Sequence, residues 1–235
     1  MSTPTSWATK NLRHTTAEML GGRGASGVRA DTGTWPLAGA PGELITEGLD
    51  GLAGRLDRHA ERGARFATWR AVTALGQQRP SEWAMRANAH TMARFARASQ
   101  EIGIVPVLEL EVQLDGTQTQ RDCAGVTAAV LLLVSRALAD ADVDPAATVL
   151  SPNMVVPGRR SLARPTPSEV AALTVNTVLA TVPAQVAGIA FLPGGPGCAA
   201  ANLAAMRSFD TPWPLTLSPL LFAGAGRARH LTIVR

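Results

Sequence analysis

The segment Ile104-Val-Pro-Val-Leu-Glu-Leu-Glu-Val112 is an apolar, β-branched run of the kind found in a strand buried inside a sheet. The residues that follow, Asp122–Ala141, place apolar side chains three and four positions apart, which is typical of an amphipathic helix. Thr148–Val156 is again apolar and of strand length. A strand, a helix and a strand in this order predict two parallel strands joined by a crossover helix.

The same alternation continues in both directions along the chain. The other strand-like segments are Gly27–Asp31, Phe66–Val72, Gly188–Pro193 and Trp213–Ser218. The other helical patterns are Leu12–Leu20, Ile45–Phe66, Ser81–Ile102 with Gly103 as its stop, and Ser168–Val182. Six strands with intervening helices predict an α/β fold, either an open doubly wound sheet or a (β/α)8 barrel short of its first strands. No G-x-G-x-x-G motif follows a strand, which disfavours a dinucleotide-binding fold.

The composition excludes several classes of protein. Of 235 residues, 46% are hydrophobic, which suffices for a sizeable core and argues against a disordered chain. The longest uninterrupted apolar run, Ala128–Val134, is too short to span a bilayer, and no secretory signal pattern is present. Cys123 and Cys198 form neither a disulfide framework nor a zinc motif, and the four histidines are dispersed. We therefore expect a cytoplasmic protein without a metal site or a membrane partner.

The basic residues are unusual in kind rather than in number. The net charge is +4, and all but one of the 22 basic residues are arginine. These arginines are scattered along the chain, whereas a protein that follows a phosphate backbone clusters them. We expect no nucleic-acid partner. The single lysine, Lys10, precedes the first predicted strand.

Polar residues mark the ends of the predicted strands. Because the carboxyl ends of parallel strands meet on one side of a sheet or barrel, these residues form a candidate site. Charged residues at alternate positions of an apolar strand point to one face, although solvated strand ends would look similar. The strand-end residues are Arg29, Asp31, Arg70, Glu109, Glu111, Ser151, Asn153, Gly194, Gly195 and Ser218.

Longer motifs surround these strand ends. In chain order they are Gly27-Val-Arg-Ala-Asp-Thr-Gly33, Gly48-Leu-Asp-Gly-Leu52, Phe66-Ala-Thr-Trp-Arg70, Glu109-Leu-Glu111, Pro152-Asn-Met-Val-Val-Pro-Gly158 and Gly188-Ile-Ala-Phe-Leu192 with Gly194-Gly195. Together they resemble the class I fructose-1,6-bisphosphate aldolases, in that family's order and spacing. The resemblance implies a (β/α)8 barrel that cleaves a ketose bisphosphate through a lysine Schiff base, without a cofactor.

The resemblance also implies roles for individual residues. Glu109 and Glu111 match the paired glutamates of the family's fifth strand, the first of which handles protons, and Asp31 matches an aspartate of the third strand. These three carboxylates are the catalytic candidates. The substrate-binding candidates are Arg29, Arg70, Ser151, Gly194, Gly195 and Ser218.

The sequence departs from the family at several of these positions. Ser151 stands where the family has its Schiff-base lysine, and Thr68 replaces a second lysine. Between Gly24 and Ala25 the family has about two β/α units that this sequence lacks, and after Ser218 a phosphate-binding arginine is missing. We therefore predict an incomplete TIM barrel over residues 25–221, an N-terminal arm over 1–24 and a basic tail over 222–235.

Three hypotheses about function follow. The protein is an aldolase-family member with weak or absent cleavage of fructose 1,6-bisphosphate, because serine cannot form an iminium. Alternatively, it binds this or a related sugar phosphate without catalysis, or serves as a partner subunit. It could also be a truncated product that folds poorly, since six strands leave two open edges. An open edge also makes a homo-oligomer possible, and the helix at Leu12–Leu20 could shield one edge only.

Overall fold

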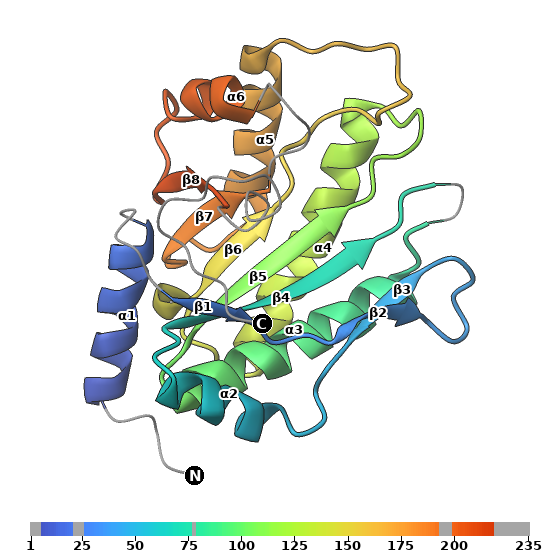
Figure 1. Ribbon diagram of the computed structural model, residues 1–235. Coiled ribbons are helices and arrows are strands. Elements are labelled where there is room, and N and C mark those ends of the chain that lie inside the picture. The colour runs from blue at the N-terminus through green and yellow to red at the C-terminus, as the bar shows by residue number, and fades with distance from the viewer. Residues whose placement is uncertain (1–5, 21–25, 77–78, 193–198, 219–235) are drawn as a thin grey trace.

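The computed structural model describes residues 6–20, 26–76, 79–192 and 199–218, with side chains from residue 11 onward (Figure 1). Its centre is a sheet of six parallel strands whose spatial order follows the chain. These strands are β1 (Gly27–Arg29), β4 (Phe66–Thr73), β5 (Val105–Val112), β6 (Val149–Pro152), β7 (Gly188–Phe191) and β8 (Leu215–Leu217). This order with intervening helices is that of a (β/α)8 barrel with two strands fewer. The predicted α/β fold and incomplete barrel are confirmed, and within the described residues β1 and β8 each have one neighbour.

Five helices cover one face of the sheet and pack in sequence against one another. They are α2 (Leu52–Glu61), α3 (Glu82–Ile102), α4 (Gln120–Asp140), α5 (Pro167–Thr181) and α6 (Ala199–Met206). The predicted helices at α3, α4 and α5 are confirmed. Capping residues next to these helices determine where they begin or end. The Ser81 hydroxyl caps α3 by accepting a hydrogen bond from the Ala84 N–H, and Gly103 ends it with a φ of 86°. Both α4 and α5 open with capping boxes.

The helix predicted from Ile45 is wrong at its start. Residues Gly33–Pro36 (β2) and Leu44–Glu47 (β3) form an antiparallel hairpin instead, and α2 begins at Leu52. Gly48 and Gly51 separate strand from helix, with φ angles of 123° and 61° that favour glycine. The hairpin is held to α3 by the Asn88 side-chain amide. This amide donates a hydrogen bond to the Leu44 carbonyl of β3 and accepts one from the Thr46 N–H.

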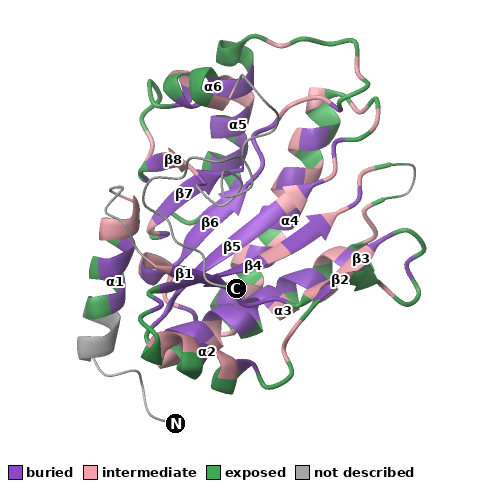
Figure 2. Ribbon diagram, in the orientation of Figure 1, coloured by how far each residue is buried: buried purple, intermediate pink, exposed green. Residues whose placement is uncertain are grey.

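The sheet is buried on both faces, but by different elements (Figure 2). On the helix side, Trp69 and Phe95 stack with ring centroids 5.3 Å apart within the main core. On the other side, helix α1 (Ser6–Leu20) covers the amino-terminal half, where Leu12 packs with Phe66 and Val149. This arrangement leaves the carboxyl-terminal half of the inner face to polar side chains.

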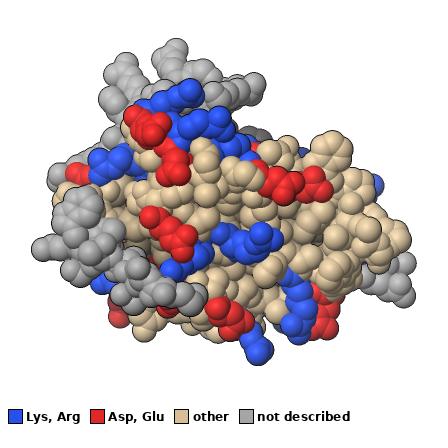
Figure 3. All heavy atoms as spheres, turned by 90° about the horizontal axis from the view of Figure 1, so that it is seen from below, with Lys and Arg blue, Asp and Glu red and all other residues tan. Residues whose placement is uncertain are grey.

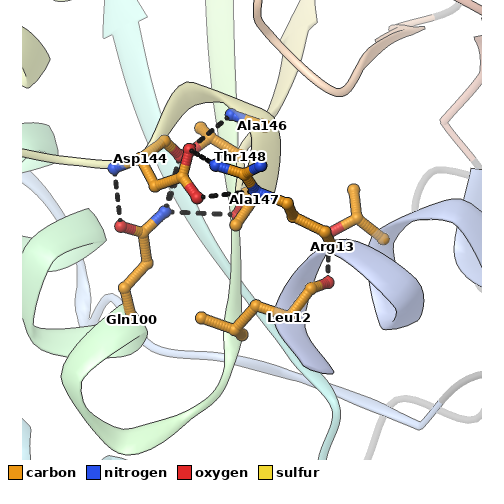
Figure 4. A network of polar contacts seen from close by, with 8 residues as sticks. Leu12, Arg13, Gln100, Asp144, Ala146, Ala147 and Thr148 are labelled. Atoms are coloured by element: carbon orange, nitrogen blue, oxygen red, sulfur yellow. Dashed lines mark hydrogen bonds and ion pairs between the residues drawn. The ribbon is translucent and has the colours of Figure 1, made fainter. Parts of the chain in front are cut away.

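A polar network fixes α1 to the amino-terminal end of the sheet (Figure 4). The Arg13 guanidinium pairs with Asp144 at 3.0 Å, just before the 3-10 helix η1 (Pro145–Ala147). The buried Gln100 side chain of α3 accepts from the Asp144 N–H and donates to the Asp144, Ala147 and Thr148 oxygens. Helix α3 therefore holds the loop on which α1 is anchored.

Helix α4 is long and apolar enough, by length and composition alone, to cross a membrane, although the apolar run Ala128–Val134 within it is short. In the structure it packs between α3 and α5 and against β5. Its buried residues include Val130, Leu131 and Val134, which contribute to the main core. We interpret α4 as a core helix of the barrel, because one such helix is weak grounds for a membrane span.

Candidate functional site

Three of the predicted site residues lie side by side on neighbouring strands. In the register of the sheet, Arg70 of β4 is opposite Glu109 of β5, and Glu109 is opposite Ser151 of β6. Register partners in a parallel sheet point to the same face, so the three side chains share the inner face near the carboxyl ends of the strands. The alternation of charged and apolar residues in these strands correctly predicted this grouping.

Arg29 links two carboxylates across the site. Its Nη1 lies 3.9 Å from Asp31 Oδ1, and its Nη2 lies 4.0 Å from Glu109 Oε2. Both carboxylates are almost fully buried, whereas the Arg29 side chain is half exposed. The guanidinium therefore brings solvent-accessible positive charge to two buried acids, and residues of β1, β4 and β5 form one cluster.

Glu109 is the most strongly perturbed acid of this cluster. Burial raises its pKa to about 7, against a smaller opposing effect of the Arg29 charge. Its Oε1 is buried and has no hydrogen-bond partner among the described residues. A carboxyl group with a pKa near neutrality can both accept and donate a proton at physiological pH. Glu109 is thus chemically suited to proton transfer.

Asp31 is buried near Glu109, but its carboxylate has more hydrogen-bond partners. Its Oδ2 accepts a hydrogen bond from the Arg70 backbone N–H at 3.2 Å. Burial raises the pKa of the Asp31 carboxyl, although the Arg29 charge and backbone N–H groups act in the opposite direction. Asp31 is therefore fixed in position by backbone and side-chain contacts from two neighbouring strands.

Glu111 occupies a different environment from Glu109. The Arg70 Nε donates to Glu111 Oε2 at 2.6 Å, and Arg70 Nη2 contacts the same oxygen. Both side chains remain about one-third exposed. The two glutamates predicted as a pair are therefore unlike: Glu109 is buried and Glu111 is held in a partly exposed ion pair.

Ser151 is completely buried in the same row. Its hydroxyl donates to the Ala190 carbonyl at 2.5 Å, so its proton is already used in a hydrogen bond to β7. Lys10, the one lysine of the chain, lies in α1. That helix packs on the amino-terminal half of the sheet, where its Leu12 belongs to the same apolar cluster as Val149 and Ala190, the layer that precedes Ser151 on the inner face.

The remaining predicted residues are not joined to this cluster. Ser218 follows β8, and its N–H donates to the Phe191 carbonyl. Its hydroxyl is buried without a partner among the described residues. Gly194 and Gly195 lie outside the described residues. The structure thus brings Arg29, Asp31, Arg70, Glu109, Glu111 and Ser151 together, and places Ser218 at the carboxyl end of the opposite edge strand.

Other reactive side chains contribute little to this site. Cys123 is buried in the first turn of α4, and burial raises the pKa of its thiol, so it is a poor nucleophile. Cys198 lies outside the described residues. Within the described part of the chain, no group of three or more His, Cys, Asp or Glu side chains is arranged to hold a metal ion.

One residue that shapes the site, Arg55 of α2, is not among the predicted site residues. Its guanidinium donates to the Ala30 carbonyl, immediately before Asp31. Nothing in the local pattern distinguishes this arginine from the solvated Arg58 one turn later. Its position follows only from the way the hairpin and α2 pack against β1.

The match to known proteins covers nearly the whole chain. The family model described as glycolytic class I fructose-bisphosphate aldolase matches residues 5–226. The chain belongs to the class I fructose-bisphosphate aldolase family. It is 45% identical over 195 residues to a probable fructose-bisphosphate aldolase class 1 of Xylella fastidiosa (strain Temecula1), with 82% of this chain aligned. It is also 45% identical over 196 residues to the cytosolic fructose-bisphosphate aldolase 6 of Arabidopsis thaliana.

A solved aldolase structure agrees with this assignment. The fructose-bisphosphate aldolase of Plasmodium falciparum, in complex with TRAP and a small-molecule inhibitor, superposes with a TM-score of 0.79 at 36% identity over 82% of this chain. The chain spans 57% of that structure, and 58% and 54% of the Xylella and Arabidopsis aldolases. The fold and the family are therefore shared, over little more than half the length of these relatives.

Proposed function

We propose that this aldolase-family chain binds fructose 1,6-bisphosphate or a related sugar phosphate but has weak or absent aldol cleavage. The observation that carries the proposal is Ser151, a buried hydroxyl in the row beside Glu109, where the resemblance places the Schiff-base lysine. A lysine amine condenses with the substrate ketone to an iminium, which withdraws electrons from the bond being broken. Serine has no nitrogen to form that iminium.

The cations and carboxylates of the cluster support the binding half of the proposal. Arg29 and Arg70 present partly exposed guanidinium groups at the carboxyl ends of the strands, suited to phosphate oxygens. Glu109 offers a buried carboxyl that is protonated about half the time near pH 7 and could donate to a sugar hydroxyl or carbonyl. Gly194, Gly195 and Ser218 would contribute further phosphate contacts, as the family resemblance implies.

We further propose that residues 25–221 act as the ligand-binding barrel portion, preceded by an arm and followed by a basic tail. The cytosolic Arabidopsis relative supports a cytoplasmic location. A second function is favoured by the sheet itself. Strands β1 and β8 each pair on one side within the described residues, so another aldolase-like subunit could complete the sheet. Light scattering of the purified chain, alone and with an intact aldolase, tests this partner function.

Borohydride trapping tests the catalytic half of the proposal. Borohydride reduces a protein–ketone iminium to a stable secondary amine, which mass spectrometry locates by peptide mapping. The wild-type protein should give no adduct in the barrel after incubation with fructose 1,6-bisphosphate. A substrate-dependent adduct at Lys10 or at the N-terminal amine, the primary amines that this sequence offers, together with release of triose phosphate would overturn the proposal.

Restoring the amine provides the positive control. Ser151→Lys should gain an adduct at residue 151, whereas Ser151→Met, of similar length without an amine, should gain none. Because Ser151 is fully buried, a thermal melt of both variants establishes that each remains folded. Failure of a folded Ser151→Lys variant to trap substrate would contradict the assignment of this position.

A further inference from the structure

One arginine side chain of α2, that of Arg55, forms hydrogen bonds with the segment that carries Asp31. Arg55 Nη2 donates to the Ala30 carbonyl at 3.0 Å and to the Gly48 carbonyl, and Nη1 donates to the Asp50 carbonyl. Ala30 immediately precedes Asp31, and Gly48 and Asp50 belong to the turn between β3 and α2. The guanidinium therefore joins the end of β1 to this turn.

The same turn packs directly on the Asp31 backbone. A Cβ at Gly48 would lie 2.9 Å from the Thr32 nitrogen and 3.2 Å from the Asp31 Cα. The Thr32 N–H also donates to the Glu47 carbonyl at 2.9 Å. Only a glycine backbone fits this close to Asp31, so the turn acts as a support and Arg55 as the clamp that holds it in place.

This support matters because β1 is weakly held by the sheet. It has three residues and, within the described chain, pairs with β4 alone. Few ladder hydrogen bonds therefore fix the position of the residues that follow it. Arg29 and Asp31 both depend on this segment, and the contacts of Arg29 with Asp31 and Glu109 are at 3.9 and 4.0 Å. A small displacement of β1 would separate the cluster.

We infer that Arg55 is a positioning residue, which holds the Asp31 carboxyl and the Arg29 guanidinium beside Glu109 by fixing the end of β1 to the Gly48–Asp50 turn. Its relevance to ligand binding rests on the proposed function. The geometry needs a planar group with several donors, since three carbonyls are bound at once, and lysine would reproduce only part of it.

The pKa of the Asp31 carboxyl gives a readout of this role that does not need a ligand. That carboxyl faces Arg29, Arg70 and, across Arg29, Glu109. The charges that act on its pKa are those of Arg29 and Arg70, and burial is the largest effect. Loosening the loop would admit water to Asp31 and lower its pKa toward the ordinary value. Because the Arg55 charge is not among those that act on the pKa of Asp31, a change in that pKa after removal of Arg55 reports a change in the position of Asp31.

The experiment compares Arg55→Gln, Arg55→Lys and Arg58→Gln by carbon-13 NMR of proteins labelled at the Asp carboxyl carbons. The Asp31 signal is assigned with Asp31→Asn. Arg58 is the matched control, because it is exposed on the same helix and its Nε donates only to Gly54 within that helix. Arg55→Gln should lower the pKa of Asp31, Arg55→Lys should lower it less, and Arg58→Gln should leave it unchanged.

Binding of fructose 1,6-bisphosphate, measured by calorimetry, provides the functional readout. Arg55→Gln should weaken binding about tenfold, or about 1.4 kcal/mol. If Arg55 acts through Asp31, the double variant with Asp31→Asn should bind no more weakly than the weaker single variant.

Two results would overturn the inference. One is an unchanged pKa of Asp31 in folded Arg55→Gln, or in folded Arg55→Lys if the glutamine variant does not fold. The other is full additivity of the two substitutions in binding. If the wild-type protein binds no sugar bisphosphate, the proposed function fails, while the pKa comparison still decides the positioning role.

Discussion

At the scale of single residues, the site is defined by how unevenly its acids are solvated. Glu109 and Glu111 are two positions apart on β5, but Glu109 is buried and Glu111 shares a partly exposed ion pair with Arg70. The neighbouring strands, rather than the motif, create this difference. The strand alternation predicted that both glutamates face the site, but it could not predict which of the two carboxylates would be buried.

Stability should depend on the ionisation of Glu109. Its pKa rises from 4.5 to about 7 on folding, so the folded state holds its proton more tightly than the unfolded state. The bound proton of Glu109 therefore stabilises the folded state fully below about pH 4.5. As the pH rises through 7 this stabilisation is lost, and the free energy of unfolding falls by about 3 kcal/mol. Urea denaturation of the wild type between pH 5 and 8 should show this loss. Glu109→Gln should remove most of this pH dependence and should have a higher free energy of unfolding than the wild type at pH 8.

The control for this prediction is Glu111→Gln, which removes a partly exposed carboxylate on the same strand. Its denaturation midpoints should keep most of the wild-type pH dependence, because the Glu111 charge is the smallest of the effects that act on the pKa of Glu109. Burial also raises the pKa of Asp31, so any slope that remains in Glu109→Gln should have the same sign. Equal slopes for Glu109→Gln and the wild type would show that burial does not hold the Glu109 proton.

At the scale of helices and strands, the sequence predicted those elements whose ends are encoded nearby. Ser81, Gly103 and the capping boxes at Thr119 and Thr166 define α3 to α5 within a few residues. The hairpin of β2 and β3 was missed because each strand has four residues and is stabilised by its partner and by Asn88 of α3. The Arg55 clamp was missed for the same reason, since its acceptors come from two other segments.

The buried amide of Gln100 should matter more than the salt bridge that it supports. Gln100→Ala removes the partner of the Asp144 N–H and one donor from each of the Asp144, Ala147 and Thr148 oxygens, and should lower the free energy of unfolding by about 2–4 kcal/mol. Arg13→Ala breaks an exposed pair and should cost at most about 1 kcal/mol. Chemical denaturation measures both, and a larger loss for Arg13→Ala would contradict the network in Figure 4.

Two glycines should respond in opposite ways to an added methyl group. A Cβ at Gly27 of β1 would lie 2.0 Å from the buried Phe66 ring, so Gly27→Ala should destabilise the protein by about 1–3 kcal/mol. Gly54 of α2 has open space around it and helical backbone, so Gly54→Ala should stabilise by up to about 1 kcal/mol. Denaturation midpoints check both signs. Tolerance of Gly27→Ala would mean that β1 does not pack against Phe66 as described.

At the scale of the whole molecule, the protein is an open barrel with one polar end. Helix α1 and the five outer helices bury the sheet, whereas the carboxyl ends of the strands gather the charged cluster. On the face in Figure 3, basic and acidic side chains are interspersed rather than gathered in one stripe. That face offers no continuous basic surface for a phosphate backbone, and the absence of a nucleic-acid partner remains a prediction.

The alternation of strands and helices could be predicted from the sequence because each β/α unit repeats the same local pattern, whereas the strand order of a barrel, rather than of an open doubly wound sheet, was implied by the family resemblance. Whether the open sheet folds cooperatively could not be predicted, because edge pairing depends on the strands around it. The row of Arg70, Glu109 and Ser151 followed from strand alternation, whereas the link through Arg29 required the three-dimensional placement of β1.

The most direct test of the central claim is a thermal melt of the purified protein with and without fructose 1,6-bisphosphate. We expect one cooperative transition that shifts upward with ligand, since a ligand at a hundredfold excess over its dissociation constant stabilises the folded state by about 2.7 kcal/mol. A broad transition that does not respond to the ligand would contradict it, and would mean that the open barrel retains the family fold without a working sugar-phosphate site.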